Sequence, residues 1–252
     1  MGSAGTMAEA RQVPDPRVAD LVRAGRVRVA VYLPQYSKDP MTGDLKGWPI
    51  ELIRALGERL GITGIPVEHA TPPQAIAGLK AGDCDVAILG IDPTRAAEVD
   101  YSPAFAQLEY TYLVPDRSSI HSLADADRPG IRIAVVRSHA STLALTRILK
   151  NATLVYADMP APAFDLLRTG HADVFASVRP ELMKYSTQLA GSRVLDTSYG
   201  ANRFGMAVAK GQAAGRLAYM CAFIDEARAS GLLQRVIDRS GLRGLTVTPI
   251  LL

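Results

Sequence analysis

Few of the residues that support catalysis, metal binding or covalent cross-linking occur in this 252-residue chain. It has two cysteines, Cys84 and Cys221, four dispersed histidines and 6% aromatic residues. Both cysteines lie in apolar stretches without a partner at metal-ligand spacing, so we expect buried thiols rather than a disulfide or a metal site. No nucleophile triad, phosphate-binding loop or dinucleotide fingerprint is visible, and no cofactor is expected.

Long apolar runs and clusters of one charge are also missing. No run approaches the roughly 18–20 uninterrupted apolar residues that a membrane-spanning helix needs. The 28 Lys and Arg residues are scattered among 25 Asp and Glu, which leaves a net charge of +3 without a basic stripe. We therefore expect neither a membrane span nor a nucleic-acid partner. Residues 1–7 lack the basic start and apolar stretch of a secretory signal, so residues 1–25 are expected to be a tag or N-terminal extension.

The chain does contain short β-branched runs that alternate with helical patterns, which indicates an α/β fold. One helix is predicted over 48–60, because Ile50, Ile53, Leu56 and Leu60 recur at helical spacing and Gly61 follows. The expected order is a βαβαβ unit, with strands over 26–33, 65–70 and 85–90 and helices over 48–60 and 72–79.

A second unit of the same order follows, with strands over 131–136, 153–156 and 173–176 and helices over 141–149 and 161–167. Chance convergence of common α/β patterns is the alternative explanation, but identical residues stand 88 positions apart in the two units. These pairs are Pro72 and Pro160, Ala75 and Ala163, Leu79 and Leu167, Gly82 and Gly170, Asp85 and Asp173, and Val86 and Val174. We predict two similar lobes, each a mainly parallel sheet flanked by helices.

The repeat also predicts how the chain is divided. Residues 26–114 are expected to form lobe one, residues 115–203 lobe two, and residues 204–252 to return to lobe one as helices. Strand-like crossings near 113–118 and 202–209 would make a two-strand hinge. Parallel sheets place ligand sites beyond the carboxyl ends of their strands, so the loops over 33–46, 90–102, 137–142 and 177–180 are the candidate lining of a cleft between the lobes.

Three motifs resemble one known family. They are Gly47-Trp48-Pro-Ile-Glu-Leu-Ile53, Leu79-Lys-Ala-Gly-Asp-Cys-Asp85, and Thr94-Arg95-Ala-Ala-Glu-Val-Asp-Tyr-Ser-Pro103. Together they are similar to motifs of bacterial extracellular solute-binding proteins, family 3, which serve amino-acid-type ABC importers and have the type II periplasmic-binding fold. The resemblance, from about residue 26 to 242, implies a periplasmic, monomeric, non-enzymatic protein that delivers a small ligand to membrane permease subunits.

The resemblance implies that Arg95 binds the carboxylate of the ligand, because the family's arginine at this place does so. The planar guanidinium fits a carboxylate with two parallel hydrogen bonds, which supports that role over a solvated surface arginine. Gly90 and Asp92 belong to the same loop, and we expect them in the site. Tyr36 matches a position where the family often has an aromatic side chain, so it is either a wall of the cleft or part of the core.

In lobe two the family has a turn that also holds the carboxylate. The matching residues are Arg137, Ser138, His139, Ala140 and Ser141. Ser138 or Ser141 is expected to cap the following helix, and amides at that helix start favour an anion. His139 has two open interpretations, a ligand contact or an ordinary loop residue.

The departure from the family pattern lies at Val178, where amino-acid binders usually have an aspartate that accepts the ligand ammonium. Arg179 follows it. Losing an acceptor and gaining a cation disfavours a ligand with a free ammonium. We therefore expect a carboxylate without that ammonium, or one with further negative charge, bound by Arg95 with help from Arg137 or Arg179.

Two other functions share this fold. Cyclohexadienyl dehydratases resemble these binders and use an acidic residue in the cleft, and Glu181 lies near the altered position. The second alternative is the ligand-sensing domain of a receptor or regulator, for which no helix-turn-helix segment precedes residue 26. Solute capture remains the preferred prediction.

Overall fold

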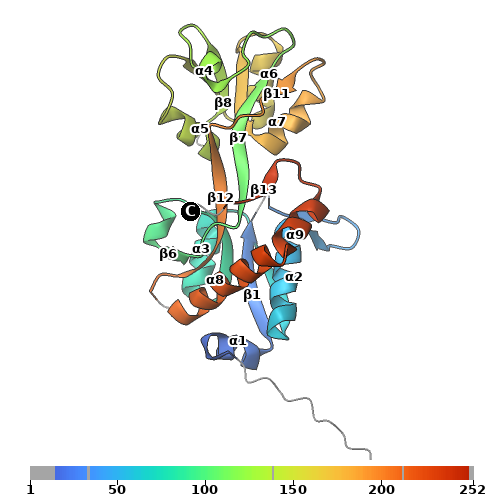
Figure 1. Cartoon of the computed structure of the whole chain (residues 1–252), viewed down its shortest axis with the longest axis vertical. Helices are drawn as coiled ribbons and strands as arrows, with labels where there is room; N and C mark the ends of the chain where they lie inside the picture. The colour runs from blue at the N-terminus through green and yellow to red at the C-terminus, as the bar shows by residue number, and fades with distance from the viewer. Residues whose placement is uncertain (1–14, 33–34, 138, 212, 250–252) are drawn as a thin grey trace, which may run out of the picture.

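A computed structural model of the chain describes residues 15–32, 35–137, 139–211 and 213–249. Figure 1 shows two lobes stacked along the long axis and joined by extended strands. One sheet runs through both lobes in the order β4-β1-β5-β12-β7-β10-β8-β9. The predicted α/β class with two similar lobes and a two-strand connection is confirmed.

Lobe one contains the first βαβαβ unit. β1 pairs in parallel with β4 on one edge and with β5 on the other. The predicted helix over 48–60 is α2, and Gly61 ends it in the left-handed conformation with φ of 67°. The elements are β1 (Arg26–Tyr32), α2 (Trp48–Leu60), β4 (Thr63–His69), α3 (Pro72–Ala81) and β5 (Val86–Gly90), with a small hairpin of β2 (Ser37–Lys38) and β3 (Leu45–Lys46) between β1 and α2.

Lobe two contains the second unit. β8 pairs in parallel with β9 and β10, as β1 does with β4 and β5 in lobe one. Its elements are α4 (Leu123–Ala126), β8 (Arg132–Val136), α5 (Ala140–Thr146), β9 (Thr153–Ala157), α6 (Pro160–Arg168), β10 (Val174–Val178), α7 (Arg179–Ser186) and β11 (Arg193–Val194). The carboxyl ends of β8 and β10 therefore meet at one edge of the lobe-two sheet.

The two lobes are connected by β7 (Ala106–Val114) and β12 (Gly200–Ala209), which pair antiparallel. A third strand, β13 (Leu245–Val247), pairs with β7 over Ala106, Gln107 and Leu108. Tyr112, Leu113 and Val114 already belong to the core clusters of lobe two. The chain thus changes lobes within β7, earlier than the predicted crossing near 113–118.

Both ends of the described chain pack on lobe one. The helices predicted within residues 204–252 are α8 (Ala214–Ala229) and α9 (Leu232–Ser240). Within the predicted tag or extension, the short helices η1 (Pro16–Val18) and α1 (Ala19–Ala24) are folded against this lobe, with η1 in contact with α8. Val18 and Leu21 are 0% and 2% exposed in its core, so residues 16–24 are part of lobe one.

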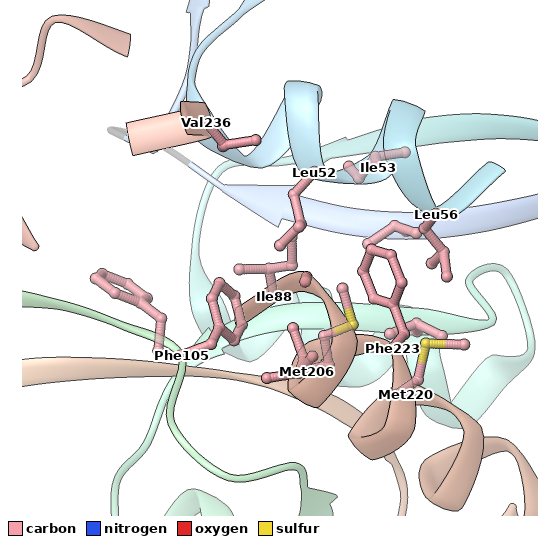
Figure 2. Packing of buried hydrophobic residues seen from close by; sticks show 14 of the residues in the cluster. Leu52, Ile53, Leu56, Ile88, Phe105, Met206, Met220, Phe223 and Val236 are labelled. Atoms are coloured by element: carbon pink, nitrogen blue, oxygen red, sulfur yellow. The ribbon is translucent and has the colours of Figure 1, made fainter. Parts of the chain in front are cut away.

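The core of lobe one is formed where α2 and α8 pack over β5 and β12 (Figure 2). Among its largest fully buried side chains are Leu52, Ile53, Leu56, Ile88, Phe105 and Phe223. Trp48 is 2% exposed and contacts two rings, that of Phe105 with centroids 5.9 Å apart and that of Phe204 at 5.2 Å. Phe105 directly precedes β7 and Phe204 lies on β12, so the only tryptophan packs where the connecting strands leave lobe one.

The sequence repeat corresponds to a repeated contact. In lobe one the carboxylate of Asp85 accepts hydrogen bonds from the Arg28 backbone N–H (2.8 Å), Nε (3.1 Å) and Nη2 (2.8 Å). In lobe two Asp173 accepts the same three bonds from Arg132 at the same distances. Each pair joins the start of the first strand of its unit to the start of the third.

No helix among the residues described combines the length and apolarity that crossing a bilayer requires.

Candidate functional site

The carboxyl end of β5 positions Arg95. After Gly90 the chain turns through Asp92, whose Oδ1 accepts the Thr94 N–H at 2.9 Å, into the 3-10 helix η2 (Arg95–Ala97). This turn brings the half-buried Arg95 guanidinium back to β5, where Nη1 donates to the Gly90 carbonyl at 3.0 Å. Arg95 forms no ion pair with any carboxylate of the residues described, which is the condition that favours an incoming anion.

Gly90 is enclosed by polar groups. Its carbonyl also accepts the hydroxyl of Tyr101 at 3.0 Å, from β6 (Val99–Tyr101), and its N–H donates to the hydroxyl of Tyr32 at 3.4 Å. A Cβ at this position would lie 2.6 Å from Asn202 Oδ1 and 3.2 Å from Arg95 Nη1. Only glycine therefore allows both side chains to approach the backbone this closely.

Three tyrosine hydroxyls lie close enough to Arg95 to be affected by its charge, and none of them neutralises it. Burial raises the pKa of Tyr32 and Tyr110, and raises that of Tyr101 to about 12, while the positive charge of Arg95 acts in the opposite direction on all three. These hydroxyls are therefore neutral at physiological pH. They supply hydrogen-bonding groups around a positive centre.

Tyr36 and Asp92 have local partners. Tyr36 is half-buried against the lobe-one core, and burial, together with the neighbouring Glu68, raises the pKa of its hydroxyl. Glu68 in turn pairs with Lys38 at 2.9 Å. Asp92 holds the turn before Arg95 through its carboxylate, so its first role is to position that arginine. Ligand contact by Tyr36 and by Asp92 stays a prediction.

The lobe-two turn follows β8. Arg137 is exposed, donates to Asp158 at 3.1 Å and lies over the ring of Tyr156, 5.1 Å from its centroid. The side chains of Arg137 and Asp158 are 60% and 86% exposed, so their ion pair is weak and leaves Arg137 available to a ligand. Ser138 lies outside the described residues.

The predicted serine cap of α5 is not the arrangement seen for Ser141. His139 is the N-cap residue, is exposed, and makes no side-chain cap bond, while Ala140 begins the helix. Ser141 is 3% exposed, so it points into lobe two. There it lies near the buried hydroxyl of Tyr199, whose pKa burial raises well above its usual value. The serine thus connects the turn to the aromatic cluster beside β12.

Val178 ends β10 as the N-cap of α7, and Glu181, the acidic residue that follows it most closely among the described residues, does not replace the missing aspartate. Glu181 accepts a hydrogen bond from Ser177. Ser177 shares a face with Phe175, which packs with Leu182, whereas Val178 alternates to the other face. The Glu181 carboxylate therefore does not take the place of an acid at position 178.

The guanidinium of Arg179, expected to help bind the ligand, bonds other parts of the chain. Its Nε donates to Glu109 at 2.8 Å, and its Nη1 and Nη2 donate to the carbonyls of Leu195 and Asp196 at 2.9 and 2.7 Å. The side chain is 14% exposed, and its methylene groups pack on Gly244. Arg179 thus joins α7 to β7, and its charge is already paired with Glu109.

The comparison with known families agrees with this arrangement. The bacterial extracellular solute-binding proteins, family 3, match residues 26–241, a segment that includes both lobes and both connecting strands. The chain belongs to this family. The expected type II periplasmic-binding fold is likewise confirmed by solved structures of family members.

A glutamine-binding protein of Geobacillus stearothermophilus is 25% identical over 178 residues, which are 69% of this chain and 67% of that protein. The chain spans about two thirds of the length of the glutamine-binding proteins it matches.

Among solved structures, an ancestral cationic amino acid solute-binding protein has a TM-score of 0.69 and 24% identity, covering 88% of this chain and 98% of that one. An ancestral cyclohexadienyl dehydratase has a TM-score of 0.59 and 23% identity, covering 89% and 95%. A binder and an enzyme share this fold, so fold alone does not separate the two functions.

Several residues of the site were missed by sequence reasoning. Tyr101 lies inside the Arg95 motif, so a signal for it existed. Asn202 and Tyr110 come from the connecting strands, and nothing in their local sequence places them beside Arg95. The structure brings Gly90, Asp92 and Arg95 together in lobe one. Which predicted residues touch a ligand stays a prediction.

Proposed function

We propose that this protein is the solute-binding component of an ABC importer and captures a small carboxylate-bearing molecule between its lobes. The observation that carries the proposal is Arg95, a half-buried guanidinium that donates to the Gly90 carbonyl at 3.0 Å. The neutral hydroxyls of Tyr32 and Tyr101 bond the same glycine, and Arg95 has no ion-pair partner among the described residues. A bidentate bond to a carboxylate would use its remaining donors.

The ligand we propose is an anion rather than a standard α-amino acid. Among the described residues, an ammonium bound near Val178 would find neither Glu181, which is turned to the other face, nor Glu109, which is paired with Arg179. An unpaired ammonium in a closed site is costly. Arg137, exposed at the turn after β8, is the second cation that would meet a negatively charged ligand.

The proposed mechanism is capture followed by closure. A ligand that touches both lobes favours the closed form through contacts that the open form lacks. We propose that the closed monomer then docks on permease subunits outside the cytoplasmic membrane, in the periplasm. No chemical step is assigned to the site, and no residue is given a catalytic role.

Native mass spectrometry of the purified protein would weigh any retained ligand. Thermal-shift titrations would then compare succinate, 2-oxoglutarate, pyroglutamate and benzoate with glutamine and lysine, since a ligand that binds only the folded state raises the unfolding midpoint. We expect the carboxylates to raise it, and Arg95→Gln to abolish the rise. Arg54→Gln, an exposed arginine on α2, is the charge-matched control and should keep it.

The result that would overturn the proposal is a midpoint raised by glutamine or lysine and by no ammonium-free carboxylate. The dehydratase alternative is tested separately by incubation with prephenate. Appearance of phenylpyruvate, absent in Arg95→Gln, would establish an enzyme instead of a binder.

A further inference from the structure

Asn202 occupies an unusual place on the strand that links the lobes. It is half-buried on β12, and its Oδ1 and Cγ lie 2.6 and 3.5 Å from the position that a Cβ on Gly90 would take. Arg95 Nη1 lies 3.2 Å from the same point. The carboxamide and the guanidinium therefore share one small space over the glycine, although η2 and β12 are far apart in sequence.

The surroundings of this space suit a planar, negatively charged group. Tyr32 and Tyr101 bond the Gly90 backbone from the other sides, so they do not compete for the donors of Asn202. The carboxamide oxygen is its end nearer to Gly90, which leaves the Nδ2 group as the donor toward the ligand. An amide and a guanidinium side by side present parallel N–H groups, the arrangement that a carboxylate accepts best.

We propose that Asn202 is a second anchor for the ligand carboxylate, acting with Arg95 and specifying an unprotonated, planar acid group. This inference rests on the proposed function. Asn202 belongs to a connecting strand, whereas Arg95 belongs to lobe one alone. A carboxylate held by both residues therefore fixes the position of β12 relative to lobe one at the point where the chain passes between the lobes.

The placement can be tested without any ligand. Asn202→Asp keeps the shape of the side chain and puts a carboxylate beside Arg95, in the manner of a tethered ligand. We expect its unfolding midpoint at pH 7 to rise by roughly 2–4 °C over the wild type. In an Arg95→Gln background the same substitution should give no rise. Equal effects in the two backgrounds would show that residue 202 does not face the guanidinium and would overturn the inference.

The binding role is tested by titration with the carboxylate of the panel that shifts the wild-type midpoint most. Asn202→Ala should weaken its affinity roughly tenfold or more, the usual effect of losing a hydrogen bond to a charged group, and Asn202→Asp should abolish binding. Arg203→Ala changes the next residue of β12, an exposed side chain on the opposite face, and should bind as the wild type does.

The outcomes separate this inference from the proposed function. Wild-type affinity in Asn202→Ala would overturn the inference while the carboxylate proposal stands. If Asn202→Asp raises the midpoint through Arg95 but no carboxylate of the panel binds the wild type, the paired site is supported and the carboxylate proposal fails. Circular dichroism on each variant verifies that lost binding is not lost folding.

Discussion

At the scale of the residue, Gly90 shows how a missing side chain creates a site. Two polar side chains from different parts of the chain stand where its Cβ would be, and two tyrosines bond its backbone. Glycine is needed here because side chains approach its backbone closely, and not because of a positive φ. The backbone of Gly90 has the ordinary extended conformation of β5. The side chains of the site thus gather around the backbone of Gly90.

Gly90→Ala should therefore disturb binding more than folding. The added methyl would meet Asn202 Oδ1 at 2.6 Å and push aside side chains that have room to move, so we expect a stability loss of about 1–3 kcal/mol. Carboxylate affinity should fall roughly tenfold or more, because both anchors are displaced. Urea unfolding and titration measure the two effects.

The control is Gly215→Ala, in the first turn of α8, where the nearest heavy atom to an added Cβ is 3.5 Å away. This variant should bind as the wild type does. Unchanged affinity in Gly90→Ala would contradict the shared space that we describe around Arg95.

Sequence reasoning found the residues that a local motif carries. Arg95 and its turn follow from one short segment, because the turn bonds that position the arginine are made within five residues. Asn202 and Glu109 were beyond its reach, because the pairing of β12 with β5 brings Asn202 to Gly90 and the pairing of β10 with β7 brings Arg179 to Glu109. The partner of Arg179 was missed for the same reason, because Glu109 is 70 residues away in sequence.

At the scale of the element, the two Arg–Asp pairs fasten equivalent strands in the two lobes. Burial acts to raise the pKa of Asp85, but hydrogen bonds from Arg28 outweigh it and hold that pKa below its usual value. Hydrogen bonds from Arg132 lower the pKa of Asp173 in the same way. Both carboxylates therefore stabilise the fold when ionised.

Asp85→Asn and Asp173→Asn should each lower the free energy of unfolding by about 1–2 kcal/mol at pH 7. Since the folded pKa values are depressed, this stabilisation is fully present above the unfolded pKa of about 4 and is lost as the pH falls through the folded pKa. The difference between wild type and variants should then shrink in urea unfolding at pH 3. Asp83→Asn, an exposed neighbour, should show little effect at either pH.

A difference that stays constant from pH 7 to pH 3 would mean that the variants act through packing rather than through charge. The two variants also test the repeat. Because Asp85 and Asp173 accept the same three hydrogen bonds, the two substitutions should lower the free energy of unfolding by similar amounts.

The elements that sequence predicted and those it missed differ in length. α2 extends over 13 residues with a regular apolar face and a glycine stop, so its bounds follow from periodicity. α1 has six residues and β13 has three, too few for a period to show. Their formation depends on tertiary contacts, α1 on the buried Leu21 and β13 on the free edge of β7.

At the scale of the whole molecule, side-chain contacts add to the two connecting strands in holding the lobes together. Arg179 connects α7 of lobe two with Glu109 of β7 and packs on Gly244, in the turn before β13. The contact joins parts from both sides of the connection, so it bears on how the lobes are oriented.

Breaking this contact should reduce stability without removing binding. Arg179→Gln and Glu109→Gln should each cost about 1–3 kcal/mol in urea unfolding, because the remaining partner is left partly buried and unpaired. The double variant should cost less than the sum of the two. Carboxylate affinity should persist in all three. Complete loss of binding in Arg179→Gln at unchanged stability would return this residue to the ligand site.

The position of Trp48 gives the molecule a built-in optical signal. It is the single tryptophan of the chain, and its indole ring contacts two phenylalanines, Phe105 directly before β7 and Phe204 on β12. Trp48 and both rings belong to the lobe-one core, on the two segments that lead into lobe two, so a rotation of lobe two that bends these segments is expected to change the packing of the indole and its emission. Closure is thus open to measurement in the unlabelled protein, in real time and at the low concentrations that tight ligands demand.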